Sequence, residues 1–483
     1  MSHNRYIKAL VILIFCISYL VIYGSTWLDM ERVWRASATY NHCYLILPIS
    51  IWFMLKKRNT PHSNTMYSPY FIWLPVLFIL LMILVWLLAF AADIALLMHI
   101  AAVFSLPALF WLIFGTKAAK THRFALGYLV FLIPFGEELS LQLQNITADI
   151  TVLMLQISSI PVFRQGLYLS TPVGMFEVAE ACSGLRFLIA SLAISTLFAY
   201  LNYKSVIKQI SFIIFMTVIS IIANGFRAFM LVYIGEKSDM QLGFGADHYL
   251  YGWLFFGLVL MAGFWLGGRF ADDDIQFKHS ALKLTAKPIQ IPQISTMLLI
   301  VTAAVISLNL KIVTPPETPA PALSQSAQLT DANSDWGVLF VDSLAFSHKQ
   351  DAQHIEYARA VYALKQTQGE LFSWQNQLYD KKNWLIVEQH SQANYTLLQL
   401  TSLAGDYRSI LFWYQVGNQR FTKQLPTKIQ QTLDYYFDSD ATLTINAISI
   451  KGLPPHDALT LLTNVADKFP SMMLKIQSNK EEL

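Results

Sequence analysis

Blocks of about twenty consecutive apolar residues, rather than amphipathic stripes, dominate the chain up to residue 311. Such blocks match the hydrocarbon thickness of a bilayer and predict membrane-spanning helices. Two of the blocks, 40–55 and 124–135, are short enough to be tilted, interfacial or re-entrant instead. The predicted fold class is a polytopic α-helical membrane protein of about eight or nine spans, with candidates at 7–24, 40–55, 70–90, 94–115, 124–135, 183–201, 209–234, 250–268 and 293–311.

The pattern changes after the last apolar block. A Pro-rich linker is followed by short runs of alternating apolar and polar residues and by amphipathic stretches, which predict a small α+β extracytoplasmic domain. The expected domains are a multi-span part at 1–290, a last span at 291–312, the linker at 313–334 and the α+β domain at 335–483. In that domain we expect strands at 383–390, 395–403, 408–416 and 441–450, and helices at 370–379, 425–437 and 457–469.

Charged residues make up 13% of the chain and hydrophobic residues 55%, and the basic residues follow alternate spans. Because loops rich in Lys and Arg stay in the cytoplasm, the N-terminus is expected inside and the α+β domain outside. The first apolar block is expected to be an uncleaved anchor, since no small-residue cleavage site follows it closely. The segment 136–182 becomes a long external connection, where function is commonly carried.

The three cysteines, Cys16, Cys43 and Cys182, all lie in the membrane part, so no disulfide framework supports the α+β domain. Cys16 and Cys43 are expected to be packing residues. The sequence has no Walker loop and no metal-ligand spacing such as HExxH or paired CxxC. We therefore expect no metal and no cofactor, and partners that include membrane lipid but no nucleic acid.

The expected topology brings three polar residues to one membrane face. Cys182, in EACSGLR, stands at the outer start of the sixth span, and His248, in GADHYLYGW, stands at the outer start of the eighth. Arg227 lies eight residues before Gly235, where the seventh span exits, which corresponds to about 10–12 Å below the outer end. A thiol, an imidazole and a guanidinium on one face predict a candidate active site.

The chemistry of such a site is coherent. A helix N-terminus and a nearby imidazolium favour the thiolate of Cys182, and His248 can take or return a proton. Arg227 can stabilise an oxyanion or hold a substrate carboxylate. Backbone N–H groups of Ser183 and Gly184 suit a developing oxyanion. The expected positioning residues are Glu177 and Glu180, which can orient His248 or an arginine.

Simpler readings stay open for each of these residues. A cysteine at a helix start is commonly inert, and an interfacial histidine is commonly a hydrogen-bonded surface group. Arg227 can extend its side chain outward to water. An arginine within a span nevertheless costs about 2.5–3.5 kcal/mol on insertion scales, so it usually marks a site.

Three sequence blocks resemble those of the exosortases, in the expected order. They are VAEACSGLRFL, NGFRAFM with its N-x-x-R pattern, which includes Asn224, and DHYLYGWLFF. The stretch TYNHCYLILPISIWFML resembles the family's early block with His42, although Cys43 stands where many members have Gly. YARAVYALKQTQGELFSWQNQL and ILFWYQVGNQRFTKQ resemble a domain fused to, or encoded beside, exosortases of the exopolysaccharide-associated kind (exosortase A type).

The resemblance implies a cysteine-type endopeptidase or transpeptidase with Cys182 as nucleophile and Arg227 and His248 as its partners. It implies that the substrates are exported proteins ending in a Pro-Glu-Pro motif, an apolar span and a basic tail. Cleavage would pass through a thioester, followed by transfer to an unidentified acceptor. It also implies a multi-pass protein of the Gram-negative inner membrane with a periplasmic C-terminal domain, linked to exopolysaccharide machinery.

Two other functions remain compatible with the residues. A non-enzymatic polysaccharide export component would use Arg227 as an anion site, and a membrane acyltransferase that modifies polysaccharide would use Cys182 and His248 on an acyl group. In the α+β domain, Trp413 and Tyr414 are expected to pack in the sheet rather than to bind sugar.

Overall fold

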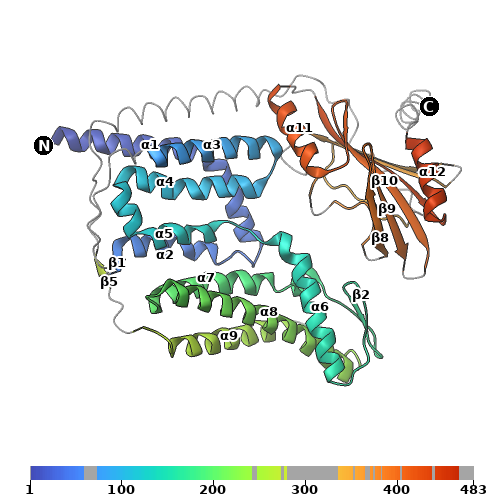
Figure 1. The fold of residues 1–483 in the computed structure, drawn as a ribbon, viewed down its shortest axis with the longest axis horizontal. Coiled ribbons are helices and arrows are strands. Elements are labelled where there is room, and N and C mark those ends of the chain that lie inside the picture. The colour runs from blue at the N-terminus through green and yellow to red at the C-terminus, as the bar shows by residue number, and fades with distance from the viewer. Residues whose placement is uncertain are drawn as a thin grey trace. The chain divides into compact units, whose positions relative to one another are not determined.

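The structure is a computed structural model (Figure 1). It describes residues 2–58, 73–241, 247–272 and 277–279 and, with gaps at 352–353, 365–369, 374–375, 382, 403–404 and 438–440, residues 335–466. The chain divides into two compact units. The first, called here the membrane unit, comprises Met1–Trp86 and Ala95–Ala303, and the second, called here the sheet unit, comprises Leu87–Ile94 and Ala304–Leu483.

Helices form the membrane unit. In chain order they are α1 (Ser2–Ala36), α2 (Cys43–Leu55), α3 (Trp73–Ala92, whose last turn belongs to the sheet unit), α4 (Ala95–Thr121), α5 (Arg123–Tyr128), the 3-10 turns η2 (Leu129–Leu132) and η3 (Glu137–Leu139), α6 (Ser140–Ile157), the turn η4 (Glu180–Cys182), α7 (Leu185–Asn202), α8 (Val206–Lys237) and α9 (Asp247–Gly268). Helices α7, α8 and α9 lie side by side (Figure 1), and α6 packs against α8. The short strands β1 (Lys56–Arg58) and β5 (Phe277–His279) pair antiparallel.

Among the described residues, five helices are long and apolar enough to cross a membrane, or six if one bent pair counts as a span. The bent pair joins Arg123–Leu132 to Glu137–Ile157 at 64°. Pro134 and Gly136, whose φ is +102°, lie at this break, and neither residue favours an uninterrupted helix. The predicted segment 293–311 lies outside the described residues, so the expected eight or nine spans stay a prediction.

A small antiparallel sheet connects α6 to α7. Its strands are β2 (Phe163–Gln165), β3 (Tyr168–Ser170) and β4 (Met175–Glu177). Leu169 and Phe176 point into a core shared with Leu155 of α6 and Val232 of α8. At the outer end of the sheet the Thr171 hydroxyl donates to the Glu236 carboxylate at 2.6 Å. The predicted external connection is therefore folded, and its packing on α6 and α8 positions the start of α7.

The sheet unit contains a seven-stranded antiparallel sheet of order β6-β7-β12-β10-β9-β8, with β11 paired to β10. The strands are β6 (Ala345–Gln350), β7 (Glu356–Ala363), β8 (Trp384–Ser391), β9 (Thr396–Ser402), β10 (Tyr407–Val416), β11 (Gln419–Phe421) and β12 (Thr442–Lys451). Helices α11 (Gln424–Phe437) and α12 (Pro455–Ala466) complete it. A C-terminal α+β region is thus present.

Both faces of the sheet are covered, because successive side chains of a strand point to opposite faces. Phe412 and Tyr414 of β10 belong to one core, against which Tyr435 of α11 packs. Leu411 and Trp413 belong to the other core, together with Leu462 of α12. Trp413 and Tyr414 are buried, which confirms that they pack in the sheet.

Two expectations are wrong. The described residues of 370–379 form turns and a bridge rather than a helix, because the Asn376 side-chain amide donates to the carbonyl oxygens of Glu370 and Leu371 and Gln377 pairs with Leu339. Cys16 lies within α1 as expected, but it is exposed rather than packed. Cys43 is buried and donates to the Phe131 carbonyl oxygen at 3.2 Å, as a packing residue does.

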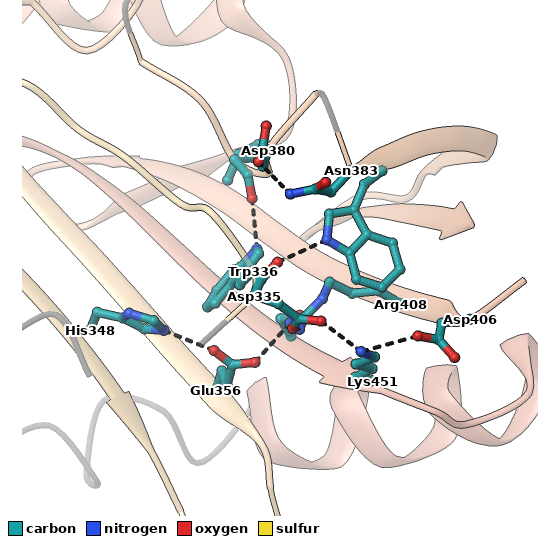
Figure 2. A network of polar contacts seen from close by, with 12 residues as sticks. Asp335, Trp336, His348, Glu356, Asp380, Asn383, Asp406, Arg408 and Lys451 are labelled. Atoms are coloured by element: carbon teal, nitrogen blue, oxygen red, sulfur yellow. Dashed lines mark hydrogen bonds and ion pairs between the residues drawn. The ribbon is translucent and has the colours of Figure 1, made fainter. Parts of the chain in front are cut away.

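A buried ion network ties the strands of the sheet unit together (Figure 2). The Arg408 side chain, 1% exposed, donates to the Glu356 carboxylate and the Ser449 hydroxyl, both at 2.8 Å, and also pairs with Asp335. His348 shares Glu356 from the other side at 3.0 Å, and both of these side chains are buried. Arg408 therefore links the central strands β10, β12 and β7 through charge-assisted hydrogen bonds.

We expect Arg408→Met to lower the free energy of unfolding of the sheet unit by about 3–5 kcal/mol, because Glu356 would remain buried without its cation. Hydrogen exchange of the β10 and β12 amides in the full-length protein measures this. The control Lys451→Met removes a cation that is 40% exposed and should cost no more than about 1 kcal/mol. Equal losses in the two variants would contradict a structural role of the buried pair.

The pKa of Asp335 predicts a dependence on acid. Burial raises this pKa, but hydrogen bonds and positive charge from Lys451 and Arg408 outweigh the burial and hold it below its ordinary value. A carboxyl with a lowered folded pKa stabilises the fold above its unfolded pKa of about 3.9, and that contribution is lost as pH falls through the folded pKa. The urea concentration that unfolds half of the sheet unit should therefore decrease as the pH is lowered below about 4. This decrease should be less steep in Asp335→Asn. Parallel pH curves for the two proteins would refute this.

Candidate active site

Cys182 lies three residues before the first residue of α7, close to the helix start where the sequence predicts it. It ends the turn η4, and its N–H donates to the Ala179 carbonyl oxygen at 2.8 Å. The next residues cap the helix: the Ser183 hydroxyl accepts the Leu185 N–H at 3.3 Å, and Gly184 adopts a left-handed conformation with φ +81°. The chain therefore turns sharply between the thiol and the helix, which glycine permits without strain.

The side chain of Asn224 in α8 binds the turn formed by Cys182, Ser183 and Gly184. Its side-chain amide donates to the Cys182 carbonyl oxygen and to the Thr147 hydroxyl of α6, both at 2.9 Å. The contact with Gly184 is close, since a Cβ built on Gly184 would lie 2.6 Å from the Asn224 amide nitrogen. Asn224 thus joins α6, the start of α7 and α8 at one point, and this is the position of the N-x-x-R block.

Arg227 lies three residues after Asn224 and therefore on the same face of α8. Its guanidinium carbon is 5.5 Å from the ring centre of Phe187 in α7. The guanidinium also packs on Gly252 of α9, where a built Cβ would lie 2.6 Å from Nε. The charge of Arg227 acts electrostatically on the Cys182 thiol. The structure therefore brings Cys182, Asn224 and Arg227 together, as two of the three sequence blocks suggest.

His248 is the second residue of α9, and its side chain lies outside the described part of the chain. Its backbone position is informative nonetheless. Gly252 follows His248 by four residues, which is about one helical turn, and Gly252 is the residue that Arg227 contacts. The backbone of α9 thus places residue 248 one turn from the guanidinium.

The remaining expected residues have other surroundings. The Ser183 N–H donates to the Glu180 carbonyl oxygen at 3.0 Å, so a role as oxyanion donor competes with this bond. Glu177 is exposed at the end of β4, opposite Tyr168 of β3. Glu180 is also exposed, and its charge acts on Glu137.

The site contains residues that the sequence reasoning did not single out. Thr147 holds the Asn224 amide, and Gln144, one turn earlier in α6, donates to the Val178 carbonyl oxygen at 2.9 Å. Phe187 and Gly252 form the surroundings of Arg227. Gly252 lies inside the quoted block DHYLYGWLFF, whereas no local pattern marks Thr147 or Gln144 as neighbours of Cys182.

The early block lies outside this group of contacts. His42 Nδ1 is 3.1 Å from the Thr39 carbonyl oxygen, and Cys43 is packed against Phe131. Both interactions are local to α2 and its neighbour η2. Because Cys43 stands where many family members have Gly, we assign that block no catalytic role, and this stays a prediction.

Comparison with known proteins gives one family. The sequence model of the transmembrane exosortases (Exosortase_EpsH) matches residues 34–265. No curated protein and no solved structure matches the chain. The matched segment includes Cys182, Asn224, Arg227 and His248 and ends before residue 304, where the C-terminal part of the sheet unit begins. The match supports a membrane protein with a cysteine-type transpeptidase function in general terms. Residues 34–265 of this chain therefore belong to the transmembrane exosortase family.

Proposed function

We propose that this protein is a membrane-embedded cysteine protease or transpeptidase that cleaves C-terminal Pro-Glu-Pro sorting signals of exported proteins. The observation that carries the proposal is the Asn224 amide, which binds the Cys182 backbone one turn from Arg227. That contact holds the backbone of Cys182 one helical turn along α8 from Arg227, whose charge acts on the thiol. Such an arrangement supplies a nucleophile and a stabilising positive charge at the same position.

In the proposed reaction the Cys182 thiolate attacks the carbonyl carbon of the scissile peptide bond. The carbonyl oxygen becomes an oxyanion, which Arg227 stabilises, and the C–N bond then breaks as His248 gives a proton to the leaving amine. The product is a thioester on Cys182. An acceptor nucleophile, or water, next attacks the thioester carbonyl, and the thiolate leaves while His248 takes the nucleophile's proton.

Arg227 is suited to this role by its surroundings. It is half-buried, packs over an aromatic ring and lies against the backbone of α9. A charge in such a low-dielectric position acts more strongly than in water. The Asn224 side chain is itself buried at this position, so the contact that it makes with the Cys182 backbone is shielded from water.

The setting of the reaction follows from the resemblance and the charge distribution. We propose the Gram-negative inner membrane as the location, with the sheet unit in the periplasm. The proposed partners are exported proteins with a sorting tail, an acceptor molecule and exopolysaccharide machinery. The resemblance of two C-terminal stretches to a domain that accompanies exopolysaccharide-associated exosortases supports the last of these.

Cys182→Ala should abolish processing of a co-expressed protein that carries a Pro-Glu-Pro sorting tail, with the tail's size followed on a blot. Cys16→Ala, at an exposed cysteine remote in sequence from the site, is the matched control and should process normally. Membrane levels of both variants are compared. Processing by Cys182→Ala equal to that of the wild type would exclude the thiol as nucleophile.

The same experiment distinguishes the two alternative functions. No processing by any form, with a substrate from the same source, would favour a non-enzymatic export component. Altered glycan acylation with unchanged protein size would favour an acyltransferase.

Gly252→Ala tests the position of Arg227. The added methyl would lie 2.6 Å from Nε and must displace the guanidinium, whereas the control Gly257→Ala on the same helix meets nothing within 4 Å. We expect alkylation of Cys182 by iodoacetamide, followed by mass spectrometry, to slow about 2–10-fold in Gly252→Ala because the thiolate loses a nearby cation. Gly257→Ala should react at the wild-type rate. Identical alkylation rates in the two variants would show that the position of Arg227 does not affect the reactivity of the Cys182 thiol.

A further inference from the structure

One helix of the sheet unit exposes a row of large apolar side chains. Four positions of α11 spaced by four residues are exposed by 71%, 54%, 46% and 85%: Leu425, Ile429, Leu433 and Phe437. Residues four apart lie on one face of a helix, and the row extends over about 18 Å. Single exposed apolar residues are ordinary, but a continuous row on one helix face marks an interaction surface.

The opposite face of α11 is already used. Thr427 and Gln431 are buried, and the Gln431 side-chain amide donates to the Leu364 carbonyl oxygen. Tyr435 packs against the core that covers one face of the sheet. Helix α11 lies beside the sheet (Figure 1) and is fixed to it through one face. The exposed apolar row is on the other face.

We propose that this row lies in the outer surface of the lipid bilayer, so that α11 is an interfacial helix. Amphipathic helices of this kind bury one apolar face at the boundary between headgroups and acyl chains. The exposed Lys423 stands just before the helix, where an ammonium group suits anionic lipid headgroups.

The chain itself keeps this partner within reach. The described C-terminal part of the sheet unit starts at Asp335. The preceding apolar block of the sequence ends at residue 311. The residues between them cannot extend over more than about 80 Å. A tethered domain meets the bilayer at a high effective concentration, so even a short apolar row suffices for lasting contact.

The test uses the full-length protein in lipid nanodiscs of phosphatidylethanolamine and phosphatidylglycerol. The nanodiscs contain a phospholipid with a photoactivatable diazirine in its acyl chain, and after irradiation the lipid adducts on the protein are mapped by mass spectrometry. We compare the wild type with Ile429→Glu/Leu433→Glu. The matched control is Ile386→Glu/Val387→Glu, which changes two exposed apolar residues of β8 in the same unit.

We expect lipid adducts on α11 in the wild type and in the β8 control, and at least about 10-fold fewer on α11 in Ile429→Glu/Leu433→Glu. All four changed positions are exposed, and far-UV circular dichroism checks that the fold is kept. A wild type without lipid adducts on α11 would overturn the proposal. Adducts that are equally frequent in Ile429→Glu/Leu433→Glu would overturn it too.

Discussion

One side-chain amide holds the candidate site together. Asn224 donates to the backbone of Cys182 and to Thr147, and it fills the space that a side chain at residue 184 would occupy. The left-handed turn at Gly184 is compatible with this contact only because glycine has no Cβ. The position of the thiol therefore depends on α8 as much as on its own helix. Arg227 is one turn away on α8, so the same contact sets the distance between the cation and the thiol.

The sequence predicts most of the fold because the strongest patterns are long. Apolar blocks identify α1, α3, α4, α7 and α8 as candidate spans, and alternation identifies the strands β8, β9, β10 and β12. Errors arise where distant contacts decide the local structure. The stretch 370–379 has a helical composition, but the hydrogen bonds of Asn376 and the isolated bridge of Gln377 to Leu339 hold its described residues in turns. Strands β6 and β7 were not predicted either, although β7 coincides with a quoted block.

The residues of the candidate site also fall into two groups: those that the sequence predicts and those that only the fold reveals. Cysteine and arginine are rare enough in an apolar sequence to attract notice, since an arginine within a span is costly unless its surroundings compensate. The Phe187 ring and the buried Gly252, whose lack of a side chain leaves room for the guanidinium, are part of that compensation. Neither is conspicuous in a membrane sequence, where aromatic and small residues are common. Thr147 is one hydroxyl among many on α6, and only the fold reveals that it meets Asn224.

The proposed substrate suits the position that the sequence predicts for Cys182 in the membrane. The thiol precedes α7, and the charge distribution predicts that this end of the helix is the outer one. A substrate whose cleavage motif precedes its own apolar span presents the motif at the same level when that span is inserted. Enzyme and substrate are then aligned by the bilayer before any specific contact forms. Confinement of both molecules to one plane raises their effective concentration, which allows a site with few specific contacts to select its substrate by depth.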